Sequence, residues 1–493
     1  MPERPLLCVT ITAATTRELR ARRDAVVDAD IVELRLDSVS DPDVQAALAG
    51  RQRPVLITCR PLWEGGAFAG AERERHALLS AALEQGAEYV DVEWRAGFGD
   101  LISRRDGRGV VVSMHEFGPS PRDLADRYRA MRATGAEVVK LAVGAERLVD
   151  TLPLFAIGRG LGEGERAVLV AMGTAGLPTR VLAAHLRSRW TYAGGEAHIG
   201  QIGPARLLGE FRFRSLTERT SIYGVVGRPI GHSVSPAMHN AGFAALGIDA
   251  VYLPLEAESA EDFAGFAEAL GVRGASVTAP FKRAVLERVD EADPITRRVG
   301  ALNSLKIDAA RWLGRNTDVA GFLAPLRERT VLKGARVVVL GAGGGARAVV
   351  TGLVDEGARV TISARNLARA EEVAGTAGAA VSAWPPPPNS WDVLVNATPV
   401  GTFPRVDQSP MAGQPLDGHL VYDLVYNPSK TRLQADAEAA GCQALGGLAM
   451  LVEQARDQFE WWTGARPDSR LFAAAAEARV RDMNSESQME TAR

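Results

Sequence analysis

Short runs of hydrophobic residues alternate with longer Ala-, Leu- and Arg-rich stretches along the chain as far as Gly209. Most of the runs are almost continuously apolar, which is typical of strands that are buried on both faces of a parallel sheet. Eight such runs separated by helical stretches are what a (β/α)8 TIM barrel requires. The predicted strands are residues 6–12, 31–37, 54–60, 89–94, 110–115, 138–143, 167–173 and 190–194.

A second α/β pattern follows a charged and irregular stretch at residues 210–221. It begins with an apolar run at residues 222–226, and its clearest unit lies further along the chain. There a strand at 335–340 is followed by a glycine-rich turn, a helical stretch at 347–356 and a second strand at 359–363. This order of elements is typical of a nucleotide-binding α/β domain. A chain of 493 residues is also too long for one ordinary domain.

Composition and charge argue against several classes of binding partner. The formal net charge of −3 gives no electrostatic reason to expect nucleic acid or an anionic membrane as a partner. The three cysteines, Cys8, Cys59 and Cys442, are far apart and form neither a disulfide framework nor a metal-binding knuckle, so no metal is expected. The sequence shows no leader peptide and no apolar run of about 18 residues, so a reducing cytoplasm is the expected location. The oligomeric state is left open.

Polar residues interrupt the predicted barrel strands near their carboxyl ends. They are Glu33, Arg35, Arg60, His115 and Lys140. Barrel active sites are built at this end of the strands, so these side chains form a candidate site. Lys140 can also be interpreted as an ordinary strand-end lysine whose long side chain reaches water. His115 favours the chemical interpretation, because it ends the preceding strand and adjacent strands place such residues side by side.

A lysine beside a histidine suggests Schiff-base chemistry. A lysine with the ordinary pKa near 10.4 is only about 0.04% neutral at pH 7, and desolvation together with nearby arginines would raise that fraction. A neutral amine attacks a ketone to form an iminium, which acidifies the adjacent C–H bond. Histidine is suited to remove that proton and to protonate a leaving hydroxyl. We therefore predict elimination of water from a hydroxyketone, and Arg35, Arg60 and Arg180 indicate a carboxylate on the same substrate.

The motifs of this half resemble the type I 3-dehydroquinate dehydratase family. They are Glu33-Leu34-Arg35, Arg60 with Glu64-Gly65-Gly66, Ser113-Met114-His115, Lys140, Met172-Gly173 and Gly200-Gln201, in that family's order. The resemblance implies that Lys140 forms the Schiff base and that His115, oriented by Glu64, is the acid–base residue. It also implies that Glu33, Arg35, Arg60, Arg180 and Gln201 hold the substrate's hydroxyls and carboxylate. The family usually has a serine where this chain has Ala197-His198, so either binding is weaker or His198 replaces the hydroxyl.

The glycine-rich turn of the second half favours dinucleotide binding. Gly341 and Gly343 permit a tight turn and close approach of a pyrophosphate, and Ala346 takes the third position of the pattern. Gly344 and Gly345 complete the turn, and the amino end of the helix that follows offers its amides and its dipole to phosphates. No acidic residue follows the second strand. Arg365 and Arg369 lie there instead and favour NADP through its 2′-phosphate, although both can also be ordinary surface arginines.

The remaining motifs resemble shikimate dehydrogenase over residues 222–475. They lie at 226–236, 276–282, 300–304, 316–318, 396–398, 423–426 and 447–454, in the order of that family. The resemblance implies that Lys282 and Asp318 move a proton at a carbonyl oxygen while a nicotinamide supplies hydride. It further implies substrate contacts from Ser233, Ser235, Thr278, Asn303, Tyr426 and Gln454, and cofactor contacts from Asn396 and Thr398. Two departures, Ser276 for the usual asparagine and Val319-Ala320 where glycine is common, bear on substrate affinity.

These patterns predict three structural parts. They are a barrel at 1–212, a substrate-binding domain at 219–320 completed by helices at 446–480, and a Rossmann NADP-binding domain at 321–445. The two families catalyse consecutive steps, from 3-dehydroquinate through 3-dehydroshikimate to shikimate, so we predict a bifunctional enzyme that acts on these small molecules.

Two alternatives remain open. One is catabolic oxidation of quinate or shikimate by the second half. The other is a sensor or repressor that has lost its chemistry, and the presence of Lys140, His115, Lys282 and Asp318 without a DNA-binding extension argues against it.

Overall fold

The computed structural model describes residues 4–195 and 200–491 of the chain. The chain divides into two compact units. The first comprises residues 1–221 with 253–270, and the second comprises residues 222–252 with 271–493. The three predicted domain boundaries stay predictions.

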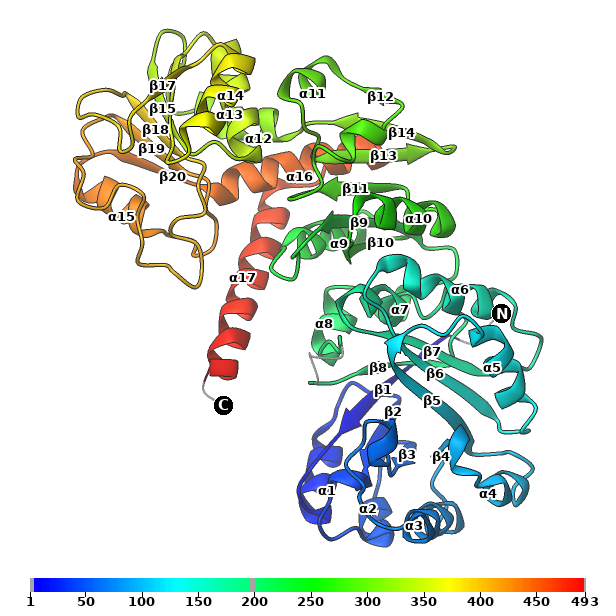
Figure 1. Cartoon of the computed structure of the whole chain (residues 1–493). Coiled ribbons are helices and arrows are strands. Elements are labelled where there is room, and N and C mark those ends of the chain that lie inside the picture. The colour runs from blue at the N-terminus through cyan, green and yellow to red at the C-terminus, as the bar shows by residue number, and fades with distance from the viewer. Residues whose placement is uncertain (1–3, 196–199, 492–493) are drawn as a thin grey trace. The chain divides into compact units, whose positions relative to one another are not determined.

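The first unit contains a sheet of eight parallel strands with helices between them (Figure 1). The order in the sheet is β7-β6-β5-β4-β3-β2-β1-β8, so neighbours in sequence pair from β1 to β7 and β8 returns to pair with β1. At the β7–β8 seam the backbone N–H of Arg189 donates to the carbonyl of Ala167 at 2.7 Å. The predicted (β/α)8 barrel is confirmed. The strands are β1 (Leu6–Ile11), β2 (Ile31–Arg35), β3 (Val55–Thr58), β4 (Tyr89–Glu93), β5 (Val110–Pro119), β6 (Val138–Gly144), β7 (Ala167–Met172) and β8 (Trp190–Ala193).

Local sequence signals explain where several barrel helices begin. The side chain of Thr15 accepts a hydrogen bond from the amide of Glu18 before α1, and Asp43 caps α2 through the amide of Ala46 in the same way. Pro178 occupies the first turn of α7, where its missing N–H costs no hydrogen bond. The helices are α1 (Thr16–Ala25), α2 (Val44–Leu48), α3 (Glu72–Glu84), α4 (Gly99–Ser103), α5 (Leu124–Arg132), α6 (Leu152–Arg159), α7 (Leu177–Val181) and α8 (Pro204–Gly209).

The interior of the barrel is built in layers to which alternate strands contribute. Toward the amino ends the layers are apolar and pack as one buried cluster: Cys8, Leu56, Val111 and Val168 from odd-numbered strands, and Ile31, Val138 and Trp190 from even-numbered ones. One layer further up, the even-numbered strands contribute Glu33, Asp91, Lys140 and Tyr192, all at most 4% exposed. We call these four residues the central layer. Three ionisable groups other than tyrosine thus occupy positions that aliphatic side chains usually fill.

A second sheet is mixed and has the order β10-β9-β11-β13-β14-β12. Its strands are β9 (Ser221–Gly227), β10 (Ala250–Glu256), β11 (Gly274–Val277), β12 (Glu291–Ala292), β13 (Ser304–Asp308) and β14 (Arg311–Arg315), with helices α9 (Ser235–Ala245) and α11 (Pro294–Val299). The end of β10 from Leu253 onward and the helix α10 (Ala260–Leu270) are grouped with the first unit, and the rest of the sheet, from Ile222 onward, belongs to the second. Two C-terminal helices, α16 (Gly447–Thr463) and α17 (Ser469–Thr491), share its core, because Phe459, Trp462 and Phe472 pack with Phe243 and Tyr252.

The third sheet is entirely parallel and has the order β17-β16-β15-β18-β19-β20. Counted from β15, this is the 3-2-1-4-5-6 order of a dinucleotide-binding Rossmann fold, as predicted. The strands are β15 (Arg336–Leu340), β16 (Arg359–Ser363), β17 (Ala380–Ser382), β18 (Val393–Asn396), β19 (Leu420–Asp423) and β20 (Gln443–Gly446). The accompanying helices are α12 (Asp318–Arg327), α13 (Gly344–Asp355), α14 (Leu367–Ala377) and α15 (Arg432–Ala439).

Candidate active sites

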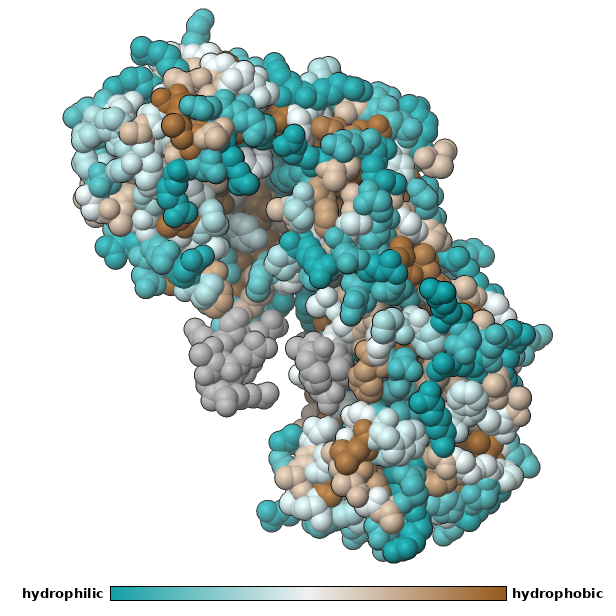
Figure 2. Space-filling view, viewed as in Figure 1, coloured by the Kyte–Doolittle hydropathy of each residue, from teal (hydrophilic) through white to brown (hydrophobic). Residues whose placement is uncertain are grey.

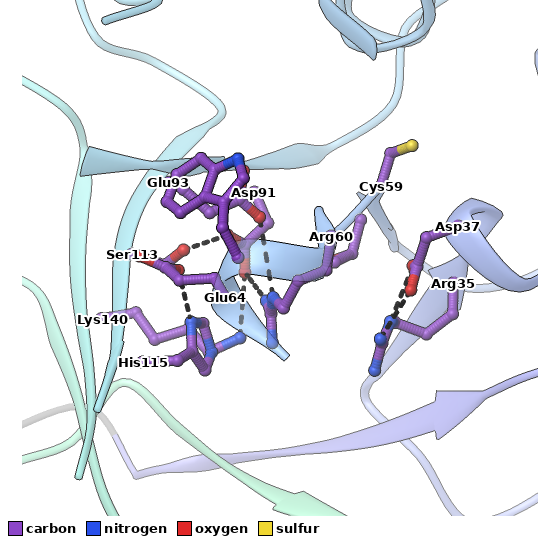
Figure 3. Close-up of polar contacts among 12 residues, drawn as sticks. Arg35, Asp37, Cys59, Arg60, Glu64, Asp91, Glu93, Ser113, His115 and Lys140 are labelled. Carbon is purple, nitrogen blue, oxygen red and sulfur yellow. Dashed lines mark hydrogen bonds and ion pairs between the residues drawn. The ribbon is translucent and has the colours of Figure 1, made fainter. Parts of the chain in front are cut away.

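The ammonium group of Lys140 points toward Asp91, another member of the central layer (Figure 3). Its Nζ donates a hydrogen bond of 2.9 Å to Oδ2 of Asp91 and is 3.7 Å from Oε1 of Glu33. The ring of Tyr192 lies 4.6 Å from Nζ and adds a cation–π contact. The lysine side chain is 4% exposed, so the interpretation as a strand-end lysine that reaches water is wrong.

Hydroxyl groups from the flanking strands hold the two carboxylates of this layer. Thr10 and Thr58 donate to the two oxygens of Glu33 at 2.7 and 2.8 Å, and Ser113 donates to Asp91. Burial by itself would raise the pKa of Glu33, but Lys140 leads a group of cations that outweighs burial and lowers the pKa. Glu33 is therefore a fixed anion at neutral pH.

His115 and Glu64 form a buried pair above the lysine. Nδ1 of His115 is 3.0 Å from Oε2 of Glu64, which lies in the 3-10 turn η2 (Leu62–Glu64) after β3. Burial raises the pKa of Glu64 to about 8, with the Glu93 carboxylate adding to the effect. Burial, then the cations Arg60 and Lys140, lower the pKa of His115 well below its ordinary range. The pair therefore keeps the proton of Glu64 near neutrality and loses it above about pH 8.

The predicted substrate-binding residues of the barrel line one pocket together with His115 and Lys140. Arg35 makes a two-pronged ion pair with Asp37 at 2.9 and 2.7 Å. Arg60 donates to Asp91 at 3.0 Å, and its Nε is 3.6 Å from Glu93. The pocket is lined by Thr10, Glu33, Arg35, Arg60, His115, Lys140, Ala142, Val170, Met172, Arg180, Tyr192 and Gln201. The predicted contact at Ala197-His198 lies outside the described residues.

A wider depression of about 610 Å³ lies at the opposite, amino ends of the barrel strands. Its acidic side chains serve the backbone: Asp30, Glu88 and Glu137 accept hydrogen bonds from the amides of Leu7, Val55 and Gly109, respectively. None of the predicted site residues lines it. The chemistry of the lining, rather than the size of the cavity, thus locates the site.

Asp91, Glu93 and Tyr192 are further residues of this site that were not predicted from the sequence. The signal was present in the run Tyr89-Val90-Asp91-Val92-Glu93, where every second residue of a strand carries the inward-facing side chain. Glu93 forms an ion pair with the fully buried Arg75 of α3. An ionic network therefore runs from Lys140 through Asp91 and Arg60 to Glu93. Arg75 connects this network to α3.

In the second unit Lys282 and Asp318 meet as predicted. Nζ of Lys282 donates a short hydrogen bond to Oδ2 of Asp318, and the side-chain amide nitrogen Nδ2 of Asn303 donates to Oδ1 at 2.7 Å. Asp318 is the first residue of α12, where the helix dipole stabilises a carboxylate. The same amide of Asn303 contacts Oε1 of Gln454 at 3.3 Å. Four residues from four predicted motifs therefore form one polar cluster.

Ser276 takes part in a buried hydrogen-bond chain behind this cluster. The hydroxyl of Tyr252 donates to Ser276, and Ser276 donates to Oε1 of Gln458 at 2.7 Å. Nε2 of Gln458 in turn donates to the backbone carbonyl of Asn303 at 3.0 Å. Ser276, which departs from the family pattern, thus helps to hold the backbone of Asn303 in place through Gln458 of α16. Gln458 was not predicted from the sequence.

The other departure, Val319, is explained by packing between two helices. A Cβ on Gly352 of α13 would lie only 3.1 Å from Cγ1 of Val319 on α12. The larger side chain is therefore accommodated because its neighbour is glycine.

The glycine-rich turn fits a dinucleotide. Gly341 has φ +100°, and a Cβ there would lie 2.9 Å from the methyl group of Thr398, so the turn needs glycine. Gly343 precedes the first turn of α13, and Ala346 is fully buried against the sheet, as the fingerprint requires. A cavity of about 400 Å³ joins this turn to Lys282 and is lined by Thr278, Ala279, Pro280, Lys282, Arg283, Ala301, Ala342, Gly343, Gly344, Gly345, Arg347, Arg369 and Glu372.

The remaining predicted residues of this half are placed as follows. Arg365 is exposed after β16, and Asn366 caps α14 through the amide of Arg369. Asn396 is fully buried and donates to Asp423 at 2.8 Å, so it shapes the loop toward Thr398. Ser233 accepts from the amide of Ser235 before α9, and Tyr426 is half-buried beside the core to which α16 contributes. Their individual roles stay predictions.

The face of the molecule seen in Figure 2 carries scattered apolar residues. Figure 2 shows a visible face that is mostly hydrophilic with small hydrophobic groups. Within residues 4–195 and 200–491, no helix is long and apolar enough to cross a membrane. Over the same residues, no group of three or more His, Cys, Asp or Glu side chains is arranged to hold a metal ion, and all three cysteines are free and buried.

Comparison with known proteins identifies the family. Models of four families match in chain order: type I 3-dehydroquinase at 7–218, the shikimate dehydrogenase substrate binding domain at 225–305, shikimate/quinate 5-dehydrogenase at 325–398, and the shikimate 5′-dehydrogenase C-terminal domain at 447–477. A shikimate dehydrogenase (NADP(+)) of Methanothermobacter thermautotrophicus is 40% identical over 51% of this chain and 94% of its own length.

Two further matches cover different shares of the chain. A solved shikimate dehydrogenase in complex with NADP+ aligns with a TM-score of 0.51 and 31% identity over 54% of this chain and 97% of that one. A chloroplastic bifunctional 3-dehydroquinate dehydratase/shikimate dehydrogenase of Arabidopsis thaliana is 32% identical over 95% of this chain and 83% of its own length. The chain therefore belongs to the family of bifunctional 3-dehydroquinate dehydratase/shikimate dehydrogenases.

Proposed function

We propose that the barrel dehydrates 3-dehydroquinate to 3-dehydroshikimate through a Schiff base on Lys140, and that the second half reduces 3-dehydroshikimate to shikimate with NADPH. The observation that carries the proposal is the position of Lys140. It is a buried lysine whose pocket also holds a paired histidine and three arginines. Such a pocket suits a ketone that also bears a carboxylate and hydroxyls.

In the barrel, the amine of Lys140 attacks the ketone carbon and water leaves, which gives an iminium. The iminium acidifies the neighbouring C–H bond, and Nε2 of His115 takes that proton while Glu64 holds the other ring nitrogen at 3.0 Å. The hydroxyl group β to the iminium then leaves as water after His115 returns a proton to it. Water finally hydrolyses the C=N bond, which releases the product ketone and frees the amine of Lys140. Arg35, Arg60 and Arg180 supply the positive charge that a substrate carboxylate requires.

In the second half, NADPH supplies a hydride to the carbonyl carbon when it is bound. The glycine turn, the amides at the start of α13 and the arginines at 365 and 369 are the residues that would hold it. Lys282 and Asp318 move the proton at the carbonyl oxygen. Asn303 and Gln454 orient ring hydroxyls through the same polar cluster. Ser233 and Ser235 donate to the substrate carboxylate.

Borohydride trapping tests the first half of the proposal. Reduction in the presence of 3-dehydroshikimate should inactivate dehydration and add the mass of one ligand to the peptide that contains Lys140. Lys140→Met should lose both the adduct and the elimination of water but keep NADPH-dependent reduction. The matched variant Lys282→Met should show the reverse pattern. Near-parental dehydration by Lys140→Met would mean that the barrel works without a Schiff base.

The direction of the second reaction is tested by steady-state kinetics with each ring acid. Reduction of 3-dehydroshikimate should have a higher kcat/KM than oxidation of quinate with either nicotinamide. A preference for quinate would favour the catabolic alternative.

A further inference from the structure

Asp91 is a fully buried carboxylate to which neither the motifs nor the mechanism above gives a role. It lies on β4 at the level of Lys140 and points toward it, with Ser113 on one side and Arg60 on the other (Figure 3). Ser113 donates to its Oδ1, while Oδ2 accepts from Lys140 at 2.9 Å and from Arg60 at 3.0 Å. Three donors, from β5, from β6 and from the loop after β3, thus fix the carboxylate in one orientation.

Asp91 is the group best placed to exchange a proton with Lys140. Among the described residues, the hydrogen bond to Asp91 is the only one that Nζ makes. Glu33 is further away, at 3.7 Å, and both of its oxygens already accept hydrogen bonds from threonines. His115 is engaged through Nδ1 with Glu64 and has no hydrogen bond to the lysine.

The charge state of Asp91 suits this task. Burial alone would raise its pKa, but Lys140 and then Arg60 outweigh burial and lower it, so the group is an anion before the reaction begins. The lysine that it faces is a cation in both of its long-lived forms, since the ammonium and the protonated iminium each carry one positive charge. An anion fixed beside Nζ stabilises both forms.

We propose that Asp91 is a catalytic residue of the dehydratase, which takes the proton that makes Lys140 a nucleophile and then serves as counter-ion of the iminium. This inference rests on the Schiff-base mechanism proposed above.

The proton and electron balance is as follows. One N–H proton passes from the ammonium of Lys140 to Asp91, which leaves a neutral amine and a carboxylic acid. The nitrogen lone pair forms a C–N bond as the carbonyl π electrons move to oxygen, and a second N–H proton passes to that oxygen. The carbinolamine C–O bond then breaks with the proton returned from Asp91, and water leaves. The iminium keeps one N–H, and Asp91 is a carboxylate again.

The substitution Asp91→Asn tests this step because it keeps the shape and one acceptor oxygen but removes the base. Enzyme and 3-dehydroshikimate are mixed at different pH values and quenched after set times into borohydride at one fixed pH, so that the mass of the adduct reports iminium formation. Asp91→Asn should form the adduct at least about 100-fold more slowly at pH 7, as is typical when an acid–base group is lost. Its rate should rise in proportion to hydroxide concentration, because solvent then removes the proton.

Two further variants separate the role in proton transfer from a merely structural one. Asp91→Glu keeps a carboxylate and should keep the parental pH profile, even if the rate falls. Glu93→Gln removes another buried carboxylate of β4 that does not contact Nζ, and it should also keep that profile. Adduct formation by Asp91→Asn within threefold of the parental rate, or a hydroxide-dependent profile in Asp91→Glu, would overturn the inference. Absence of any adduct on Lys140 in the parent protein would instead refute the Schiff-base mechanism itself.

Discussion

The buried pair of Glu64 and His115 makes the pH dependence of dehydration a direct test of the barrel mechanism. His115 can remove a proton from the iminium only when the pair has lost one proton, and burial raises the pKa of Glu64 to about 8. The active form therefore predominates above that pH and is lost as the pH falls below it. In Glu64→Gln the group no longer titrates, although an amide oxygen can still accept from Nδ1.

The size of the effect follows from that pKa. A group with a pKa of about 8 is about 9% ionised at pH 7 and about 91% ionised at pH 9, so kcat for dehydration should rise about tenfold over this range. Glu64→Gln should flatten the profile. It should also lower kcat at pH 9 by about tenfold, because a hydrogen bond to a charged partner is worth roughly 1–1.5 kcal/mol more than one to a neutral partner.

The assay follows the absorbance of the conjugated product between pH 6 and 9, with NADPH-dependent reduction by the same polypeptide as an internal reference. Burial and then the neighbouring Asp91 raise the pKa of Glu93 to about 7, so this group also titrates in the window. Glu93→Gln is therefore the necessary control and should keep the tenfold rise. The reasoning fails if Glu64→Gln keeps the rise, or if Glu93→Gln abolishes it.

Four other outcomes are expected. NADPH should be preferred to NADH, and Arg365→Asp should reduce the ratio of kcat/KM values by about 10- to 150-fold, the worth of one charge-assisted phosphate contact; equal values in the parent would refute this assignment. Asp318→Asn should slow reduction by about 10²–10⁴-fold and leave dehydration unchanged, and a parental reduction rate would remove Asp318 from the chemistry. Fragments 1–212 and 219–493 should each fold and keep their own activity, whereas two folded but inactive halves would point to a shared site. His198→Ala should raise KM for dehydration about fivefold, and an unchanged KM would assign His198 to the surface.

The fold could be predicted from the sequence because its signals are local. Near-continuous apolar runs marked the barrel strands, and the turn at Gly341 marked the nucleotide-binding domain. The end of β5 was predicted less well. This strand continues beyond His115 to Pro119 with a register shift after Glu116, and it pairs there with Gly144. That extension depends on a partner strand, which periodicity along one segment cannot reveal.

The sequence predicted only those site residues that belong to the family motifs. Lys140, His115 and Glu64 were recognised as members of a pattern. The structure brings Lys140 and His115 into one pocket and pairs Glu64 with His115. Asp91 and Gln458 were missed because each acts on a residue distant in sequence, Lys140 and Asn303 respectively. Such contacts depend on which side chains a layer or a helix face brings together, and this emerges only after folding.

The buried charges of the central layer, together with the neighbouring Arg60, have a consequence for how this protein can evolve. Two anions, Glu33 and Asp91, face two cations, Lys140 and Arg60, so the buried quartet carries no net charge. Removing one member leaves an uncompensated ion in the barrel, which typically costs about 3–5 kcal/mol. A barrel that loses Lys140 should thus lose stability together with activity, and removal of the charge of Asp91 should restore part of that stability. Evolution toward a non-catalytic barrel would have to replace these charged residues in pairs. Single substitutions that remove one catalytic charge are therefore selected against through stability, even where selection for the activity is weak.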